Sequence, residues 1–165
     1  MNYTDDIYVG YRYFETIPGA AEKVVYPFGY GLSYTTFDVE TVSAGVVNSN
    51  CTSEANKLYA KVRVTNTGKF SGKEVVQVYI AKPQGKLGKP AKELAAFEKT
   101  RELQPGESQL MILTWEINDM ASYDDLGKVK KSAYVLEAGS YDIYVGTSVR
   151  DVTKADYSYI LNRDV

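Results

Sequence analysis

The sequence predicts an all-β protein, folded as a two-sheet antiparallel β-sandwich of about seven strands. Apolar and polar residues alternate with a period of two along most of the 165-residue chain, as they do in strands with one buried and one solvated face. An apolar stripe with the 3.6-residue period of a helix is not found in the sequence. Strands of this half-buried kind are antiparallel as a rule, and their turn signals recur at the spacing typical of sandwiches.

Each expected strand is an alternating segment bounded by turn residues. The segment Asn66-Thr-Gly-Lys-Phe-Ser-Gly72 separates two of them, and Pro105-Gly106 precedes another. We expect Ala138-Gly139-Ser140 to close a hairpin between residues 133–137 and 141–145. The strands, about seven in number, are expected among eight segments, which are 36–46, 58–65, 75–80, 93–103, 110–117, 133–137, 141–145 and 157–161.

Two connections are longer than the others. Residues 82–92 contain four lysines, two prolines and two glycines, and we expect them to form a solvated excursion. Residues 119–131 carry charges of mixed sign and are also expected to be a loop. The carboxylate pairs Asp5-Asp6 and Asp124-Asp125 lie in polar segments, where we expect nothing nearby to shift a pKa. A glycosidase needs two carboxylates with different pKa values, so both pairs are interpreted as solvated turns or loops.

Composition excludes several classes of function. The net charge of −2 and the pI near 5.3 give no basic field, which argues against nucleic acid or an anionic membrane surface as a partner. No apolar run approaches the ~20 residues that span a bilayer. The chain has no histidine and a single cysteine, Cys51, which excludes a Ser-His-Asp nucleophile and an internal disulfide within it. We expect neither a metal nor a cofactor, since the sequence shows no dense run of oxygen ligands.

The first 35 residues are expected to form an extension, followed by the sandwich over residues 36–165. Residues 7–14 are predicted to be a strand without a partner, and residues 26–37 combine aromatic side chains with two glycines and a proline. We expect both segments to dock on another domain, with the receiving surface outside this chain; a homodimer through the extension is an alternative. The residues expected at this inter-domain contact are Tyr8, Tyr11, Tyr13, Phe14, Tyr26, Pro27, Phe28, Tyr30 and Tyr34.

Tyrosine is over-represented, with 15 residues against 5 phenylalanines and 1 tryptophan. Most tyrosines occupy alternating strand positions, which suits a half-buried sheet that packs the ring and leaves the hydroxyl in water. The alternative is a sugar-binding face, on which aromatic rings stack against the C–H groups of a pyranose. Gly29-Tyr30-Gly31 lacks the third glycine and the βαβ context of a phosphate loop, so it is interpreted as a tight turn with a close backbone approach.

Several motifs together resemble one family. Tyr8-Val-Gly-Tyr-Arg-Tyr-Phe14 and Tyr26-Pro-Phe-Gly-Tyr-Gly-Leu-Ser-Tyr-Thr-Thr-Phe37 closely resemble a junction in bacterial β-glucosidases of glycoside hydrolase family 3. At this junction the chain leaves an αβα-sandwich domain and enters a fibronectin type III-like domain. Residues 62–68 and 71–79 resemble the first long hairpin of that domain, and residues 134–146 resemble its closing strands. Its central signature is matched by Pro90-Ala-Lys-Glu-Leu-Ala-Ala-Phe-Glu-Lys99 and Leu103-Gln-Pro-Gly-Glu-Ser108.

The resemblance implies a fibronectin type III-like fold and an accessory role without catalytic groups. In the family, an Asp nucleophile lies in the barrel domain and a Glu acid/base in the αβα-sandwich domain, and neither motif is found in these 165 residues. The implied partners are the αβα-sandwich and barrel domains of a parent that hydrolyses terminal β-D-glucosides, which we expect in the bacterial cytoplasm. This chain alone is expected not to be an enzyme. The alternatives are an autonomous carbohydrate-binding module that uses exposed tyrosines and a free-standing hydrolase that uses its carboxylates.

Overall fold

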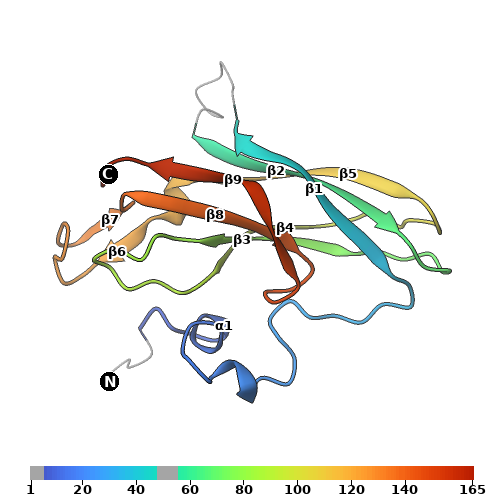
Figure 1. The fold of residues 1–165 in the computed structure, drawn as a ribbon, viewed down its shortest axis with the longest axis horizontal. Helices are drawn as coiled ribbons and strands as arrows, with labels where there is room; N and C mark the ends of the chain where they lie inside the picture. The colour runs from blue at the N-terminus through green and yellow to red at the C-terminus, as the bar shows by residue number, and fades with distance from the viewer. Residues whose placement is uncertain (1–5, 48–55) are drawn as a thin grey trace.

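Alternating apolar residues build the first of two facing sheets. The computed structural model describes residues 6–47 and 56–165, so Cys51 and Asp5 lie outside the described residues. Along β2, every second side chain from Leu58 to Val64 is fully buried, as the period of two predicts. The sheet has the antiparallel order β1-β2-β5 (Figure 1), formed by β1 (Phe37–Val46), β2 (Lys57–Asn66) and β5 (Ser108–Glu116).

The second sheet packs its inner face on the first, and the two share one hydrophobic core. Val62 of the first sheet and Ile143 of the second are both fully buried in this core. The four strands are antiparallel in the order β4-β3-β8-β9. Their bounds are Val75–Ala81 for β3, Glu93–Lys99 for β4, Gly139–Gly146 for β8 and Val152–Leu161 for β9. The predicted antiparallel β-sandwich is confirmed.

Strand β3 is buried on both faces. Val76, Val78 and Ile80 belong to the core, with exposed fractions of 1% or less. Gln77 and Tyr79 point to the opposite face and are nevertheless 5% and 0% exposed. Another part of the chain must therefore cover the outer face of the second sheet at β3.

A short third sheet takes up the start of the loop that was expected over residues 119–131, while residues 125–131 form a loop as predicted. The 3-10 helix η2 (Ile117–Met120) leads into β6 (Ser122–Asp124), which pairs with β7 (Ala133–Val135). At distances of 2.7–3.0 Å the buried Asp124 carboxylate accepts hydrogen bonds from the backbone N–H groups of Gly127, Lys128, Val129 and Lys130. Burial raises the pKa of this carboxyl group, but the four N–H donors outweigh burial and lower the pKa to about 2. The prediction of an unperturbed carboxylate pair is thus wrong for Asp124.

Two predicted hairpins are also wrong. Strand β7 pairs with β6, whereas β8 pairs with β3 and β9, so residues 133–137 and 141–145 do not form a hairpin. Strands β2 and β3 lie in different sheets, so the connection 66–72 crosses from one sheet to the other. Alternation determines which face of a strand is buried, but the hydrogen-bonded neighbour depends on contacts that are distant in sequence.

The N-terminal segment is helical where a strand was predicted. Gly10 has a φ of 60° and precedes the one-turn helix α1 (Tyr11–Phe14), and the 3-10 helix η1 (Ala21–Lys23) follows. Figure 1 shows this segment, in blue, beside the second sheet and away from the first. Among the helices of the described residues, none has the length and apolar character needed to cross a membrane.

Candidate interaction surface

Residues 6–35, here called the strap, lie across the outer face of the second sheet. The ring of Tyr11 stacks on Phe28 with the centroids 4.4 Å apart, and it meets Tyr79 of β3 edge-on at 6.3 Å. The Tyr11 hydroxyl accepts a hydrogen bond of 2.9 Å from the backbone N–H of Leu94 in β4. Aromatic packing and a backbone hydrogen bond therefore join the strap to both β3 and β4.

Gln77 holds the turn of the strap against β3. Its Nε2 donates to the carbonyl oxygens of Gly29 at 3.2 Å and Thr147 at 2.6 Å, and its Oε1 accepts from the Tyr79 hydroxyl at 2.5 Å. Burial raises the pKa of Tyr79, which keeps this hydroxyl protonated as a donor. Gly29 has a φ of 82°, and a Cβ there would lie 2.1 Å from Gln77 Oε1. The predicted tight turn and close backbone approach at Gly29 are confirmed.

Two ion pairs hold the first part of the strap. Arg12 Nη2 lies 3.1 Å from Glu93 Oε1, and Arg150 Nη2 lies 2.8 Å from Glu15 Oε1. The arginine side chains are 40% and 34% exposed, so water screens both interactions. Pairs of this kind contribute about 0–1 kcal/mol each, and they orient the strap more than they stabilise it.

The strap enters β1 through a buried polar cluster around Asn66. The Oδ1 of Asn66 accepts hydrogen bonds from Thr35 Oγ1 at 2.7 Å and from the Gly68 N–H at 3.0 Å. Its Nδ2 donates to the carbonyl oxygens of Phe70 and Leu103, both at 2.8 Å. One fully buried side chain thus joins the strap, the turn after β2 and the segment before β5.

The opposite side of the strap presents apolar residues to solvent. Tyr26 and Tyr30 stack with centroids 5.2 Å apart and remain 69% and 48% exposed, while Tyr34 is 96% exposed. Exposed apolar side chains that gather in one segment mark interaction sites on soluble proteins. The outer strap face, as we call it, consists of Val25, Tyr26, Tyr30, Leu32 and Tyr34.

The nine predicted contact residues fall into two groups. Four are half-buried, namely Tyr8, Tyr11, Phe14 and Pro27. Five are exposed, namely Tyr13, Tyr26, Phe28, Tyr30 and Tyr34. The expectation that the receiving surface lies outside the chain is wrong for the inner side of the strap, because β3 and β4 receive Tyr11 and β3 binds the Gly29 carbonyl. A contact of the exposed group with another domain stays a prediction.

The residues that receive the strap were not predicted from the sequence. Besides Gln77 and Glu93, they include Val149, whose backbone N–H donates to the Phe28 carbonyl at 2.9 Å. Only Gln77 could have indicated them from the sequence. It is an amide within the apolar pattern of a strand, and such an amide needs hydrogen-bond partners when it is buried.

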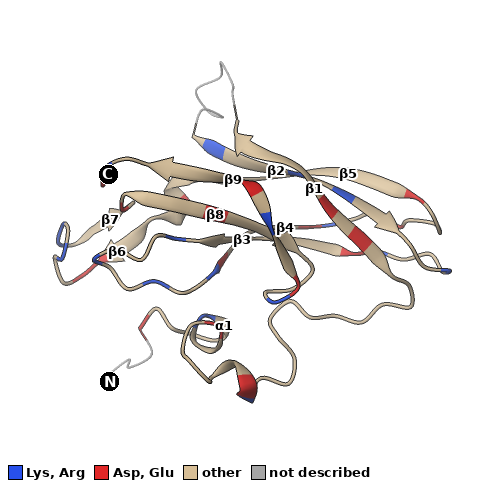
Figure 2. Ribbon diagram, in the orientation of Figure 1, with Lys and Arg blue, Asp and Glu red and all other residues tan. Residues whose placement is uncertain are grey.

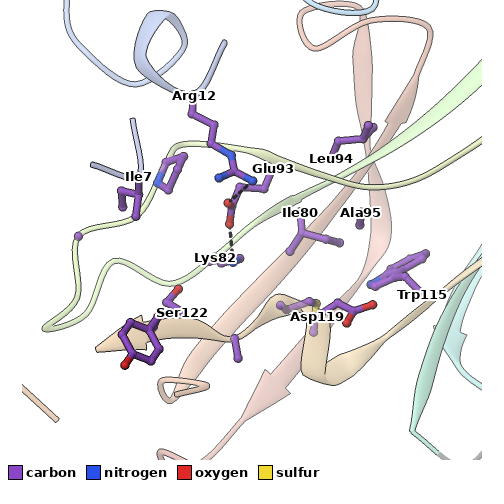
Figure 3. Close-up of a pocket in the computed structure, with 15 residues that line it drawn as sticks. Ile7, Arg12, Ile80, Lys82, Glu93, Leu94, Ala95, Trp115, Asp119 and Ser122 are labelled. Carbon is purple, nitrogen blue, oxygen red and sulfur yellow. Dashed lines mark ion pairs between the residues drawn. The ribbon is translucent and has the colours of Figure 1, made fainter. Parts of the chain in front are cut away.

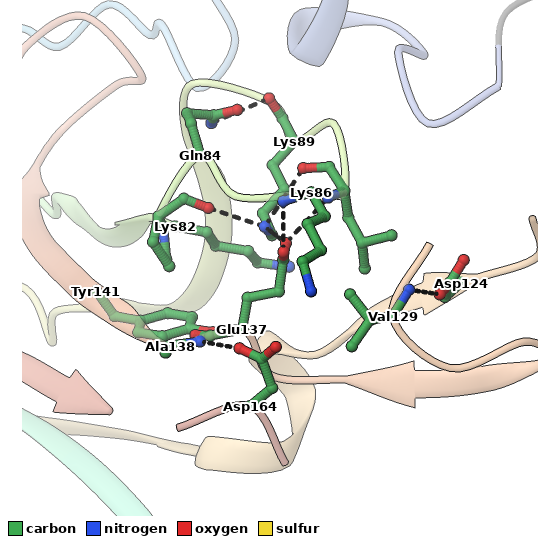
Figure 4. Close-up of polar contacts among 12 residues, drawn as sticks. Lys82, Gln84, Lys86, Lys89, Asp124, Val129, Glu137, Ala138, Tyr141 and Asp164 are labelled. Carbon is green, nitrogen blue, oxygen red and sulfur yellow. Dashed lines mark hydrogen bonds and ion pairs between the residues drawn. The ribbon is translucent and has the colours of Figure 1, made fainter. Parts of the chain in front are cut away.

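The connection 82–92 is fastened to the sandwich and is not the solvated excursion that was expected. Lys89 and Glu137 form an ion pair with side-chain exposed fractions of 1% and 4% (Figure 4). Lys82 pairs with Glu93, and Lys92 donates to a backbone carbonyl at 2.9 Å. Composition predicted exposure because lysine is rarely buried, but these lysines have partners that their sequence neighbours do not reveal.

Charge is distributed over the whole molecule. Figure 2 shows basic and acidic residues interspersed along both main sheets. Within the residues that the structure describes, no group of three or more His, Cys, Asp or Glu side chains is placed to hold a metal ion. The strap, with one side bound and one side exposed, is therefore the strongest candidate for a functional surface.

Comparison with known proteins gives a consistent set of relatives. Residues 74–149 match the profile of the fibronectin type III-like domain. Beta-glucosidase A of Butyrivibrio fibrisolvens is 57% identical over 173 residues, which cover 100% of this chain and 21% of that protein. A β-glucosidase of Ruminococcus albus is 46% identical over 149 residues, which cover 90% of this chain and 15% of that protein.

Solved structures agree with these relatives. A β-glucosidase from Paenibacillus barengoltzii superposes with a TM-score of 0.89 and 49% identity, over 99% of this chain and 18% of its own. A GH3 β-glucosidase from Bifidobacterium adolescentis gives a TM-score of 0.75 and 32% identity, over 96% of this chain and 21% of its own. The chain thus spans about a fifth of the length of these relatives.

Proposed function

Since the chain contains a fibronectin type III-like domain and matches part of GH3 β-glucosidases along its length, we propose that it is a non-catalytic accessory domain of a longer β-glucosidase-type enzyme. In this proposal the outer strap face docks on another domain of the longer protein, the αβα-sandwich or the barrel. The other domains hydrolyse terminal β-D-glucosides, and this domain stabilises them.

The two-sided strap is the observation that carries the proposal. Contacts of Tyr11 and Gln77 hold the inner side on the sheet, so the outer side has a fixed conformation before any partner arrives. A surface ordered in advance loses less conformational entropy on binding, and more of the interaction energy remains as affinity. The relatives are about five times longer than this chain. A longer protein of this kind would contain further domains on which the outer strap face can dock.

The exposed side chains are large enough to matter energetically. Full burial of one large apolar side chain contributes about 1.5–3 kcal/mol. Leu32 and Tyr34 are 89% and 96% exposed, so a partner that covers them removes almost the whole side chain from water. Docking through the outer strap face therefore predicts a stability gain of several kcal/mol for the longer protein, before the cost of ordering the partner is subtracted.

A chimeric enzyme tests the proposal. The 165-residue chain replaces the aligned segment of the Butyrivibrio fibrisolvens relative, and Tyr26→Ser, Tyr30→Ser and Tyr34→Ser are introduced together. We expect the triple variant to lower the Tm of the chimera by several degrees more than the Tm of the isolated chain, which loses only the exposed stack of Tyr26 on Tyr30, with the KM for an aryl β-glucoside unchanged. The isolated chain should hydrolyse no aryl β-glucoside.

Leu110→Ser with Ile112→Ser is the matched control, since these β5 residues are 49% and 59% exposed and lie away from the strap. An equal loss of Tm in the control and the triple variant would contradict docking through the outer strap face. Sedimentation of the isolated chain provides a second check. A dimer that the triple variant dissociates would assign the face to a second copy of this chain.

A further inference from the structure

A cavity of about 320 Å³ lies where the strap, β4, η2 and β6 meet (Figure 3). Its volume falls at the lower end of the roughly 300–1,000 Å³ that small-molecule sites occupy. Ile80, Ala95 and Met120 supply apolar wall, and a few polar side chains converge on the same space, which is the usual make-up of a ligand pocket. No residue of the outer strap face lines this cavity.

Trp115 places an unpaired hydrogen-bond donor at the cavity. The side chain is 5% exposed, and its Nε1 is the one buried side-chain nitrogen or oxygen without a partner in the described parts of the chain. A buried N–H that lacks an acceptor loses the hydrogen bond that water provides in the unfolded chain, so such groups are rare in native proteins. An acceptor oxygen of a ligand in the cavity would satisfy this donor.

Two further polar groups on the cavity wall, one on the exposed Asp119 and one on the half-buried Ser122, have no side-chain partner among the described residues. In residues 6–47 and 56–165, the Asp119 carboxylate and the Ser122 hydroxyl make no side-chain hydrogen bond or ion pair. The carboxylate is acceptor-only and the hydroxyl both donates and accepts, so together they suit ligand hydroxyl groups.

The charges around the cavity balance and favour an uncharged ligand. Arg12 and Lys82 both pair with Glu93 (Figure 3), and the Asp119 carboxylate supplies the second negative charge, so the four charges sum to zero. Asp119 remains as a carboxylate on the wall. An anionic ligand would be repelled by Asp119 and would have to displace Glu93, whereas a neutral ligand meets neither cost.

An aromatic ring stands at the edge of the cavity. Tyr123 is 52% exposed, and Tyr134 fixes its ring edge-on with the centroids 5.2 Å apart. The face of an aromatic ring carries partial negative charge and attracts polarised C–H groups. The cavity thus combines hydroxyl-binding groups on its wall with a ring that can cover the C–H face of a cyclic polyol.

We propose that this cavity binds a neutral, polyhydroxylated small molecule of monosaccharide size. Trp115 Nε1 donates to one ligand oxygen, Asp119 accepts from ligand hydroxyl groups, and Tyr123 packs on a C–H face. The site is independent of the docking proposal, because the two share no residue. Loss of docking in the outer-strap variant therefore leaves sugar binding intact, and the reverse also holds.

The single tryptophan makes the test specific. The 165-residue chain is titrated with D-glucose and, in parallel, with inorganic phosphate, while Trp115 emission is followed under selective excitation. We expect a saturable change with glucose in the millimolar range, which suits a ligand of this size, and none with phosphate. A response to phosphate, or no saturation by glucose well above millimolar concentrations, would overturn the proposal.

Matched variants locate the binding. Asp119→Asn keeps the shape of the side chain but removes its charge, and we expect about tenfold weaker glucose binding because a charge-assisted hydrogen bond is lost. Asp125→Asn is the control, since Asp125 is exposed and does not line the cavity. Isothermal titration with Trp115→Phe, after circular dichroism shows that it folds, should find no binding. Equal affinity in Asp119→Asn and Asp125→Asn would contradict the assignment of the site.

Discussion

Lys89 and Glu137 meet inside the protein, where the ammonium group of one and the carboxylate of the other are almost completely withdrawn from water. Lys89 Nζ also donates to the Pro83 carbonyl at 2.8 Å, and Glu137 accepts from the N–H groups of Lys86 at 2.6 Å and Leu87 at 3.2 Å. Burial raises the pKa of Glu137, but Lys89 and the two N–H donors outweigh burial and lower it. The pair holds the connection 82–92 against the segment just before β8.

Removal of one partner of this pair should be costly. Lys89→Met leaves the Glu137 carboxylate buried without its cation, and we expect the free energy of unfolding to fall by about 3–5 kcal/mol. Urea denaturation measures the loss. Lys86→Met, in the same connection but exposed, should change stability by no more than about 0.5 kcal/mol. A loss as small as that of Lys86→Met would show that the pair does not hold the connection.

Asp124 should make stability depend on pH in the acid range. Its pKa of about 2 in the folded protein lies below the ordinary value near 3.9, so the folded state favours the ionised form. The contribution of the ionised Asp124 to the free energy of unfolding is fully present above about pH 4 and disappears as the pH falls towards 2. The unfolding free energies of the parent chain and Asp124→Asn should therefore converge between these values. Asp125→Asn, at the exposed neighbour, should show no such convergence.

Replacement of Gly29 by alanine should loosen the strap because of the added methyl group, and not only because alanine is disfavoured at a positive φ. Gly29→Ala places a Cβ 2.1 Å from Gln77 Oε1, whereas at Gly19, with a similar positive φ of 75°, nothing lies within 4 Å of the added atom. Both variants carry the conformational cost of alanine at positive φ, about 1–2 kcal/mol. We expect faster amide hydrogen exchange across the strap in Gly29→Ala than in Gly19→Ala. Equal exchange would mean that the contact with Gln77 is readily replaced.

Asn66 should be difficult to replace, because four hydrogen bonds meet at its side chain. Asn66→Ala removes the acceptor of the buried Thr35 hydroxyl and of the Gly68 N–H, whereas the Leu103 carbonyl still accepts from the Gly72 N–H, and each buried group left unmet costs about 1–3 kcal/mol. Thermal unfolding should show a loss of roughly 2–5 kcal/mol. Asn118→Ala, at an exposed position, provides the comparison and should be nearly neutral.

Local patterns predicted the sandwich well, and contacts distant in sequence account for what they missed. The alternation from Leu58 to Val64 was sufficient for β2, because a period of two is set by the strand itself. The pairing of β7 with β6 was not predictable, since the turn residues at 138–140 suit a hairpin equally well. The same holds for Lys89, whose burial depends on Glu137, 48 residues away.

The candidate surface could be predicted only in part, because its conformation also depends on contacts that are distant in sequence. Aromatic composition singled out the strap, but the helix at Tyr11 depends on the positive φ of Gly10 and on the reception of the ring beside Tyr79. Neither is visible in a pattern of apolar residues. The Trp115 cavity gave no signal in the sequence at all, because its walls come from the strap, β4 and the segment after β5.

The contact of Tyr11 with Tyr79 determines where this domain can be cut when it is fused to another protein. A graft that starts at residue 36, where the first long strand begins, would leave Tyr79 and Gln77 bare on the outside of β3. Such a graft would expose the Tyr79 ring to solvent and would remove the Gly29 carbonyl, one of the two acceptors of the Gln77 amide. The portable unit therefore starts upstream of Tyr8, and the linker to any host is best attached there.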